Sequence, residues 1–255
     1  MNKLIGREIL SKLVDNDKSR HQPYTLENDN LKVIPAGKGI GWFSDSKGAF
    51  LYQKLTGNFM VETSVKVQKK NSINHDQRAQ FSSAGLLIRN PESGAGTESW
   101  VMYNIGYQNS FYGREIKVTR PSNGLRFDPM YFIGYRSLST LYLIPSKETG
   151  FARIRMARVG NQVRCYYCTA DSWQEEKPVS EMEAMGNGLK YPVDQFNEQE
   201  FRPTNLLLPD KVQVGIISNP GMDTKRPWKK YRDSEMLFSD YAYKKINSFD
   251  ECLED

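Results

Sequence analysis

NFMVETSVKV, residues 58–67, is the stretch that decides the fold of this chain. Along it, the side chains at odd positions, among them Val61 and Val65, form one apolar face, and those at even positions, such as Glu62, form a more polar face. Side chains of an extended chain point alternately to its two sides. The period of two therefore predicts a β-strand that is buried on one side only.

The same alternation returns along the chain, with turn residues in each gap. It is found in residues 31–35, 49–55, 84–89, 100–107, 151–159, 163–168 and 212–217. Many short strands with almost no helical periodicity are typical of all-β folds. We therefore expect an all-β protein, a two-sheet antiparallel β-sandwich with a short N-terminal helical lead.

Two turns indicate how some of these strands are connected. Gly160-Asn161 is a tight-turn signal, so the strands on its two sides should be adjacent and antiparallel. Thr56-Gly57 is interpreted in the same way, as the turn of a hairpin.

We expect one large domain with short extensions. Residues 1–24 form an N-terminal lead whose apolar residues have helical spacing. Residues 25–246 form the sandwich, with a long insertion at about 174–209, and residues 247–255 form an acidic tail.

The N-terminal lead has neither the apolar core of a secretory signal nor the length of a membrane span. Lys3, Arg7, Glu8 and Lys12 interrupt each of its apolar runs. We expect no membrane partner and a cytoplasmic location, unless the chain has been trimmed of a leader.

The charge pattern does not favour nucleic acid as a partner. The formal net charge is only +5, and residues 171–200 carry eight acidic side chains against two basic ones. The most basic segment, residues 221–235, is short and contains acidic residues of its own.

The cysteines do not indicate a disulfide framework, because there are three of them. Cys165 and Cys168 have the CxxC spacing, but residues three apart in a strand point to opposite faces. With only two histidines in the chain, a histidine-rich zinc site is not expected either.

No arrangement of residues predicts catalysis. Glycoside hydrolysis needs two carboxylates across one cleft, yet the strand at 58–67 offers only Glu62, and the strands at 84–89 and 100–107 offer none. The chain contains no G-x-S-x-G turn. We therefore lean towards a protein that is not an enzyme.

Several segments together resemble a known family. They are FLYQKLTGNFMVETSVKV (50–67), AGLLIRNP (84–91), SWVMYNIGYQ (99–108), ARIRMARVGNQVRCYY (152–167) and VQVGIISNP (212–220). In this order they resemble the concanavalin A-like sandwich domains of the DUF1349 type, which are similar to the C-terminal module of some bacterial β-xylosidases. The resemblance implies a jelly roll of two curved sheets that is associated with carbohydrate and is often non-catalytic.

Aromatic and polar side chains on or near the strands are candidates for sugar binding, since sugars stack on aromatic rings and bond to polar groups. The expected ligand-binding residues are Trp100, Asn104, Arg89, Trp42, Tyr107, Tyr112, Tyr166 and Trp173. In the strand at 100–107, we expect Trp100, Met102 and Asn104 to form the exposed set, because burying an unpaired amide is costly. Val101, Tyr103 and Ile105 should then point inward.

The same resemblance implies a structural calcium ion, held by an acid of the last strand. Asp240 has that place, with residues 27–29 as further ligands. No other cofactor is expected.

Three functions remain open. The first is a non-catalytic carbohydrate-binding or accessory module, with a glycan or polysaccharide as its partner. The second is a glycoside hydrolase or lyase acting in the concave face. The third is a domain that docks on a catalytic protein partner.

Overall fold

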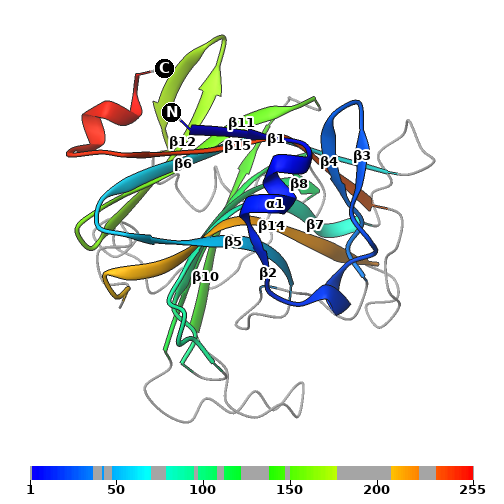
Figure 1. Cartoon of the computed structure of the whole chain (residues 1–255), viewed down its shortest axis with the longest axis horizontal. Coiled ribbons are helices and arrows are strands. Elements are labelled where there is room, and N and C mark those ends of the chain that lie inside the picture. The colour runs from blue at the N-terminus through cyan, green and yellow to red at the C-terminus, as the bar shows by residue number, and fades with distance from the viewer. Residues whose placement is uncertain are drawn as a thin grey trace.

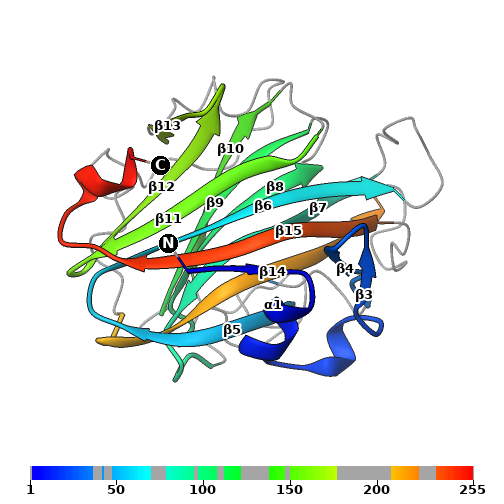
Figure 2. The same cartoon turned by 45° about the horizontal axis from the view of Figure 1, so that its top comes forward.

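Two antiparallel sheets pack face to face in a computed structural model of the chain (Figure 1 and Figure 2). The structure describes residues 2–36, 42, 48–69, 79–94, 97–107, 112–121, 138–146, 150–176, 208–223 and 234–254. The expected two-sheet β-sandwich is thereby confirmed. No helix in this described part is long and apolar enough to cross a membrane.

One sheet, the eight-stranded sheet, has the order β13-β12-β11-β6-β15-β4-β3, with β1 paired to β15. Its strands are β1 Asn2–Ile5, β3 Thr25–Glu27, β4 Asn30–Val33, β6 Phe59–Lys69, β11 Ala152–Val159, β12 Gln162–Thr169, β13 Ser172–Glu175 and β15 Ser234–Lys245.

The other sheet, the seven-stranded sheet, has the order β10-β9-β8-β7-β14-β5-β2. Its strands are β2 Val14–Asp15, β5 Ala49–Thr56, β7 Ala79–Arg89, β8 Trp100–Tyr107, β9 Tyr112–Arg120, β10 Leu138–Pro145 and β14 Lys211–Asp223.

The main core lies between the two sheets and is built from the inward-pointing set of each strand. Val61 and Val65 of β6, named above as one face of the deciding strand, are both fully buried in it. Val101, Tyr103 and Ile105 of β8 belong to the same core, so their predicted inward direction is confirmed. Period-two patterning was sufficient here because only one face of each strand meets the opposite sheet.

One of the two turn predictions is confirmed and the other is wrong. β11 and β12 pair in antiparallel register across Gly160-Asn161, with Val159 opposite Gln162. Thr56-Gly57, however, does not close a hairpin, because β5 pairs in the seven-stranded sheet and β6 in the eight-stranded sheet. Both strands present apolar faces to the same core from opposite sides, so this turn carries the chain from one sheet to the other.

The N-terminal lead is not one helix. The helix α1 covers only Arg7–Lys12, between β1, which pairs with β15, and β2, which pairs with β5. Figure 1 shows this segment passing from one sheet to the other beside the sandwich. The edges of β15 and β5 offer unpaired backbone groups. The segments on either side of α1 pair with these edges as β1 and β2 and are therefore strands, despite the helical spacing of their apolar residues.

The two ends of the long insertion are partly described. The first residues form β13, which is paired to β12 through Cys168 opposite Trp173. Residues 177–207 lie outside the described part of the chain.

In the acidic tail, a short 3-10 helix, η2 Phe249–Cys252, lies near β11 and β12 on the outer side of the eight-stranded sheet (Figure 1).

Candidate ligand-binding face

The outer face of the seven-stranded sheet brings together the largest group of buried polar side chains. Strand register places outward-pointing residues in rows across β14, β7, β8 and β9. Arg89 is opposite Trp100, and four residues further along β8 Asn104 is opposite Glu115. Asn219 of β14 is opposite Ser83 of β7.

One half of this face is an aromatic cluster, formed by Trp42, Phe50, Tyr52 and Trp100. The ring of Trp42 meets Phe50 at 5.6 Å and Trp100 at 5.8 Å, both edge to face. Phe50 stacks on Tyr52 at 5.2 Å. A Cβ at residue 48 would lie 1.9 Å from the Trp42 indole nitrogen, so Gly48 leaves the room that the ring fills.

The other half, which we call the polar row, consists of two neighbouring cross-strand pairs, Asn219 with Ser83 and Asn104 with Glu115. All four side chains are fully buried. The amide nitrogen of Asn104 donates to Ser83 Oγ at 2.8 Å. Among the described residues, no hydrogen-bond partner is found for Asn104 Oδ1, for either end of the Asn219 amide, or for the Glu115 carboxylate. Unpaired buried polar groups each cost about 1–3 kcal/mol, which makes the row a candidate for ligand binding.

Glycines give the polar row its space. Gly85 pairs with Asn104, and a Cβ there would lie 2.5 Å from the Asn104 Cα. Gly106 pairs with Ser83, and a Cβ there would lie 2.6 Å from the Ser83 Cα. Neither position can accept a side chain without moving its neighbour, so the amide and the hydroxyl lie next to bare backbone on the outward side of the sheet.

Lys117 of β9 joins the two halves of the face. Its ammonium forms an ion pair with Glu115 Oε1 at 2.9 Å, so Oε2 is the carboxylate oxygen left without a described partner. We regard the two groups as a true charge pair, because both are buried and 2.9 Å apart. The ammonium also donates to the Trp42 carbonyl at 3.2 Å.

Arg89 lies at the far end of the face from the polar row. It donates to the Ser93 carbonyl at 3.0 Å and to Gln213 Oε1 at 3.5 Å. Burial lowers the pKa of its guanidinium, and the charge of Glu98 opposes that shift. The predicted neighbours Arg89, Trp100 and Trp42 are thus on one face, although Trp42 could be placed there only by the tertiary structure.

The expected direction of Trp100, Met102 and Asn104 is confirmed, but their expected exposure is wrong. All three point away from the main core, and all three have no exposed surface. Trp100 is covered by Trp42, which comes from a distant part of the chain. A single strand pattern shows which residues share a face and does not show what covers that face.

The other predicted ligand-binding residues lie elsewhere. Tyr107 and Tyr112 pack edge to face at 5.1 Å in the main core between the sheets. Tyr166 and Trp173 lie on the outer face of the eight-stranded sheet, together with Cys252. The eight predicted positions are therefore divided among three places, because Tyr107 points to the opposite side of β8 from Trp100, and Tyr166 and Trp173 belong to strands of the other sheet.

Arg155 organises the outer face of the eight-stranded sheet. It is fully buried, lies over the Trp173 ring at 3.8 Å, and donates two hydrogen bonds to Glu62 Oε2, at 3.0 Å and 2.6 Å. It also donates to the backbone carbonyls of Cys252 and Glu254. This side chain attaches the C-terminal segment to the sheet, so Trp173 serves here as a packing surface.

The CxxC spacing behaves as expected of a strand. Cys165 is buried in the main core, and Cys168 is on the outer side with Trp173. Among the described residues, no three histidine, cysteine, aspartate or glutamate side chains are grouped as a metal site would need.

Asp240 is placed at a β-bulge of β15 and is already well supplied with partners. The Lys3 ammonium is 2.8 Å from Oδ2, and the backbone nitrogen of Ser64 donates to Oδ1 at 2.7 Å. Glu27, from the segment expected to add ligands, pairs instead with Lys32 at 2.8 Å. These contacts do not fit a calcium ligand set of six to eight oxygens, because an ammonium stands beside the carboxylate. Calcium binding stays a prediction of the resemblance.

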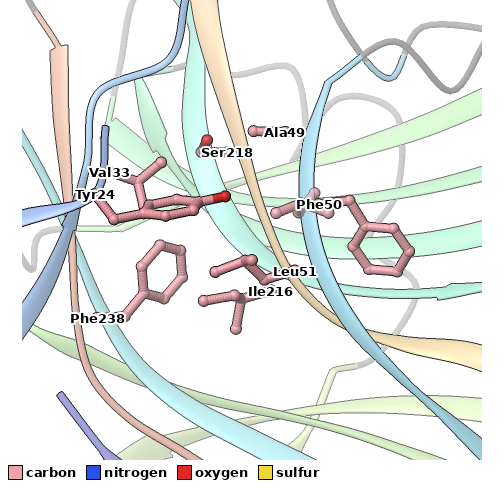
Figure 3. A pocket seen from close by; sticks show the side chains of 9 residues that line it. Tyr24, Val33, Ala49, Phe50, Leu51, Ile216, Ser218 and Phe238 are labelled. Atoms are coloured by element: carbon pink, nitrogen blue, oxygen red, sulfur yellow. The ribbon is translucent and has the colours of Figure 1, made fainter. Parts of the chain in front are cut away.

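A small internal pocket lies between the sheets near Tyr24 (Figure 3). Phe238 and Ile216 point into it from the two sheets, whereas the ring of Phe50 is on the other side of its strand. Its space is about 10 Å³, close to what one water molecule requires. A sugar does not fit there, so the pocket is no alternative to the outer face.

The polar row was not found from the sequence alone. Ser83, Glu115 and Asn219 were absent from the predicted site, and β9 was not recognised as a strand. Its sequence GREIKVTR alternates in period two, with Ile116 and Val118 inward, so the signal for an outward Glu115 was present.

Comparison with solved structures supports the fold. The chain is similar to a protein of unknown function from Saccharomyces cerevisiae, with 11% identity and a TM-score of 0.59, over 93% of this chain and 98% of that one. It is also similar to a legume lectin-like domain from Entamoeba histolytica, with 8% identity and a TM-score of 0.51, over 94% and 92%. No family model and no curated protein matches the sequence. The chain therefore has the two-sheet sandwich fold of these structures.

Proposed function

We propose that the chain is a carbohydrate-binding module whose ligand lies on the outer face of the seven-stranded sheet. The observation that carries the proposal is the polar row, in which Asn104, Asn219 and Glu115 have buried oxygens without described hydrogen-bond partners. Sugar hydroxyls are suited to such groups, because each hydroxyl both donates and accepts. The lectin-like domain among the similar structures is consistent with this chemistry.

The polar row is fully buried, so a ligand can enter only if its cover moves, and we expect the movement to include Trp42. Trp42 covers Trp100, and its carbonyl is bonded to Lys117 beside the row. We therefore expect binding to change tryptophan fluorescence, since the indole of Trp42 would leave its buried site.

The proposal is binding without turnover. On β7, β8, β9 and β14, Glu115 is the one carboxylate among the described side chains that point outward. Hydrolysis by the usual mechanism uses two. The alternative function, a hydrolase or lyase, is tested by the same binding experiment, because an enzyme would cleave the bound oligosaccharide and release products. Docking on a protein partner, the third possibility, calls for a flat apolar face, which the polar row does not supply.

The decisive experiment is a glycan array with the purified chain, followed by calorimetry on each hit. Asn219→Ala should lower the affinity for the bound glycan about 10-fold or more. The same substitution should leave the free energy of unfolding unchanged or raise it, because it removes a buried amide with no described partner. Gln174→Ala, an exposed amide on the other sheet, is the matched control and should bind like the wild type.

Two outcomes would contradict the proposal. If no glycan binds above the level of an unrelated sandwich protein, the module has another ligand. If the bound oligosaccharide is cleaved, as seen by chromatography after long incubation, the chain is an enzyme. Loss of stability in Asn219→Ala would instead show that the amide has a structural role.

A further inference from the structure

The unpartnered atoms of the polar row are mostly hydrogen-bond acceptors. They comprise Asn104 Oδ1, Asn219 Oδ1 and Glu115 Oε2, with Asn219 Nδ2 as a donor. The orientation of the Asn104 amide follows from its surroundings, because its nitrogen lies 3.5 Å from the sulfur of Met102, which can only accept. The row therefore needs a ligand that donates.

Neither Lys117 nor Arg89, two cations of this face, is placed to receive a negatively charged ligand at the polar row. Lys117 is held by Glu115 and by the Trp42 carbonyl. Arg89 donates to Ser93 and Gln213 through its two terminal nitrogens, and its Nε has no described partner. It lies opposite Trp100, four residues along β8 from Asn104 and so about 13 Å from it at the usual rise. A negatively charged ligand at the row would thus meet the Glu115 carboxylate, while Lys117 is already paired and Arg89 is too far away to reach it.

We infer that the polar row selects neutral, hydroxyl-rich sugars and rejects sugars that carry a carboxylate or sulfate at the same position. The inference rests on the proposed function and names its ligand class. A sugar hydroxyl can donate to Asn104, Asn219 or Glu115. An ionised carboxylate or sulfate group in its place has only acceptor atoms and would bring a second negative charge close to Glu115. A site with buried acceptors penalises a ligand that leaves them unpaired. The expected preference for the neutral member of a matched pair is about 10- to 100-fold in affinity.

The test uses matched pairs of oligosaccharides with the full chain. The probes are gluco-, galacto- and manno-hexaoses, each beside the same chain oxidised to uronic acid at C6, measured by calorimetry at pH 7. The neutral member of the pair that binds should bind at least 10-fold more tightly. Glu115→Gln should reduce that ratio by weakening the rejection of the acid, whereas Asn219→Ala should weaken both members.

The outcomes separate this inference from the proposed function. Equal or tighter binding of the acidic member overturns the inference and leaves carbohydrate binding intact. If neither class binds in the array or in the pairs, the proposed function fails. The wild-type ratio is measured without any variant, so the inference remains testable even if Glu115→Gln, which removes the charge partner of Lys117, does not fold.

Discussion

Replacing Arg155 by methionine should release the C-terminal segment from the eight-stranded sheet. Arg155 is fully buried, shares a carboxylate oxygen of Glu62 through two hydrogen bonds, and donates to the carbonyls of Cys252 and Glu254. Its guanidinium also lies over the ring of Trp173. Methionine preserves part of the packing and removes each of these polar contacts.

The expected loss in the free energy of unfolding is about 3–5 kcal/mol, since removing one partner of a buried ion pair leaves Glu62 with only the longer contact to Arg153, at 4.0 Å. For a domain of this size, each kcal/mol lowers the melting temperature by about 2–4 °C. The melting temperature should therefore fall by roughly 6–20 °C. Urea denaturation gives the energy directly, and differential scanning calorimetry gives the temperature.

A thiol assay reports the release of the segment itself. Burial raises the pKa of the Cys252 thiol to about 11, so at pH 8 the thiol is protonated and slow to react. Exposure should return the pKa to the ordinary range near about 8.5 and increase the thiolate fraction. Labelling with a maleimide, mapped by mass spectrometry, should be faster at Cys252 in Arg155→Met than in the wild type. The partly exposed Cys168 gives the background rate.

Arg164→Met is the matched control, because Arg164 lies on the same face, stacks on Phe249 at 4.2 Å and pairs with Glu175 at 3.1 Å. Both members of that pair are about a third exposed, so the change should cost less than about 1 kcal/mol. If Arg155→Met is as mild as this control, or if Cys252 stays protected, Arg155 does not attach the C-terminal segment and the reasoning is refuted.

Four further predictions concern the core and the faces of the sandwich. Tyr103→Phe removes a buried hydrogen bond of 2.6 Å to Glu176 and should lower the free energy of unfolding by about 0.5–3 kcal/mol. Urea denaturation measures this loss, with Tyr107→Phe as the comparison. Burial raises the pKa of the Tyr103 phenol well above its ordinary value, so this residue stabilises the fold below about pH 10 and that contribution falls as the pH rises further; the variant should show a flatter decline of stability there. Trp100→Ala should cost about 3–5 kcal/mol, because the ring is fully buried, and a mild effect in thermal melts would mean that its cover is loose. Ile105→Ala should open a cavity in the main core and lower the free energy of unfolding by about 2–5 kcal/mol. Calorimetry measures this loss, with a substitution at an exposed residue as the control. Because Asp240 is already paired with Lys3, a chelator should leave the melting temperature unchanged. If the melting temperature falls on chelation and added calcium restores it, a calcium site exists there.

Much of the fold was predictable because alternate residues of a strand point to its two faces, so the sequence shows which residues share a face. The odd positions of residues 58–67 reach the main core, and so do Val101, Tyr103 and Ile105. Each inference needs only the alternation of side chains along one strand, which is local. The Gly160-Asn161 hairpin was predictable for the same reason, since its strands are neighbours in the chain.

What the sequence alone did not determine is which strands lie side by side and what covers each face. Nothing local distinguishes the Thr56-Gly57 turn from a hairpin, because the pairing of β5 with β14 joins residues that are far apart in the chain. Likewise, Trp42 covers Trp100, and Asn219 is placed near Ser83 by contacts between distant segments. The exposure of Trp100 was therefore wrongly predicted, while its direction was right.

The candidate site shows this division most clearly. The types of residue that bind sugars were visible in the sequence, and the period of two correctly separated Asn104 from Tyr103. Only the tertiary structure brought Asn219, Asn104 and Glu115 of three strands onto one face in neighbouring positions, because register between strands is set by core packing and by pairing across the whole sheet. A side chain's face is a property of its own strand, whereas a site is a property of several strands at once.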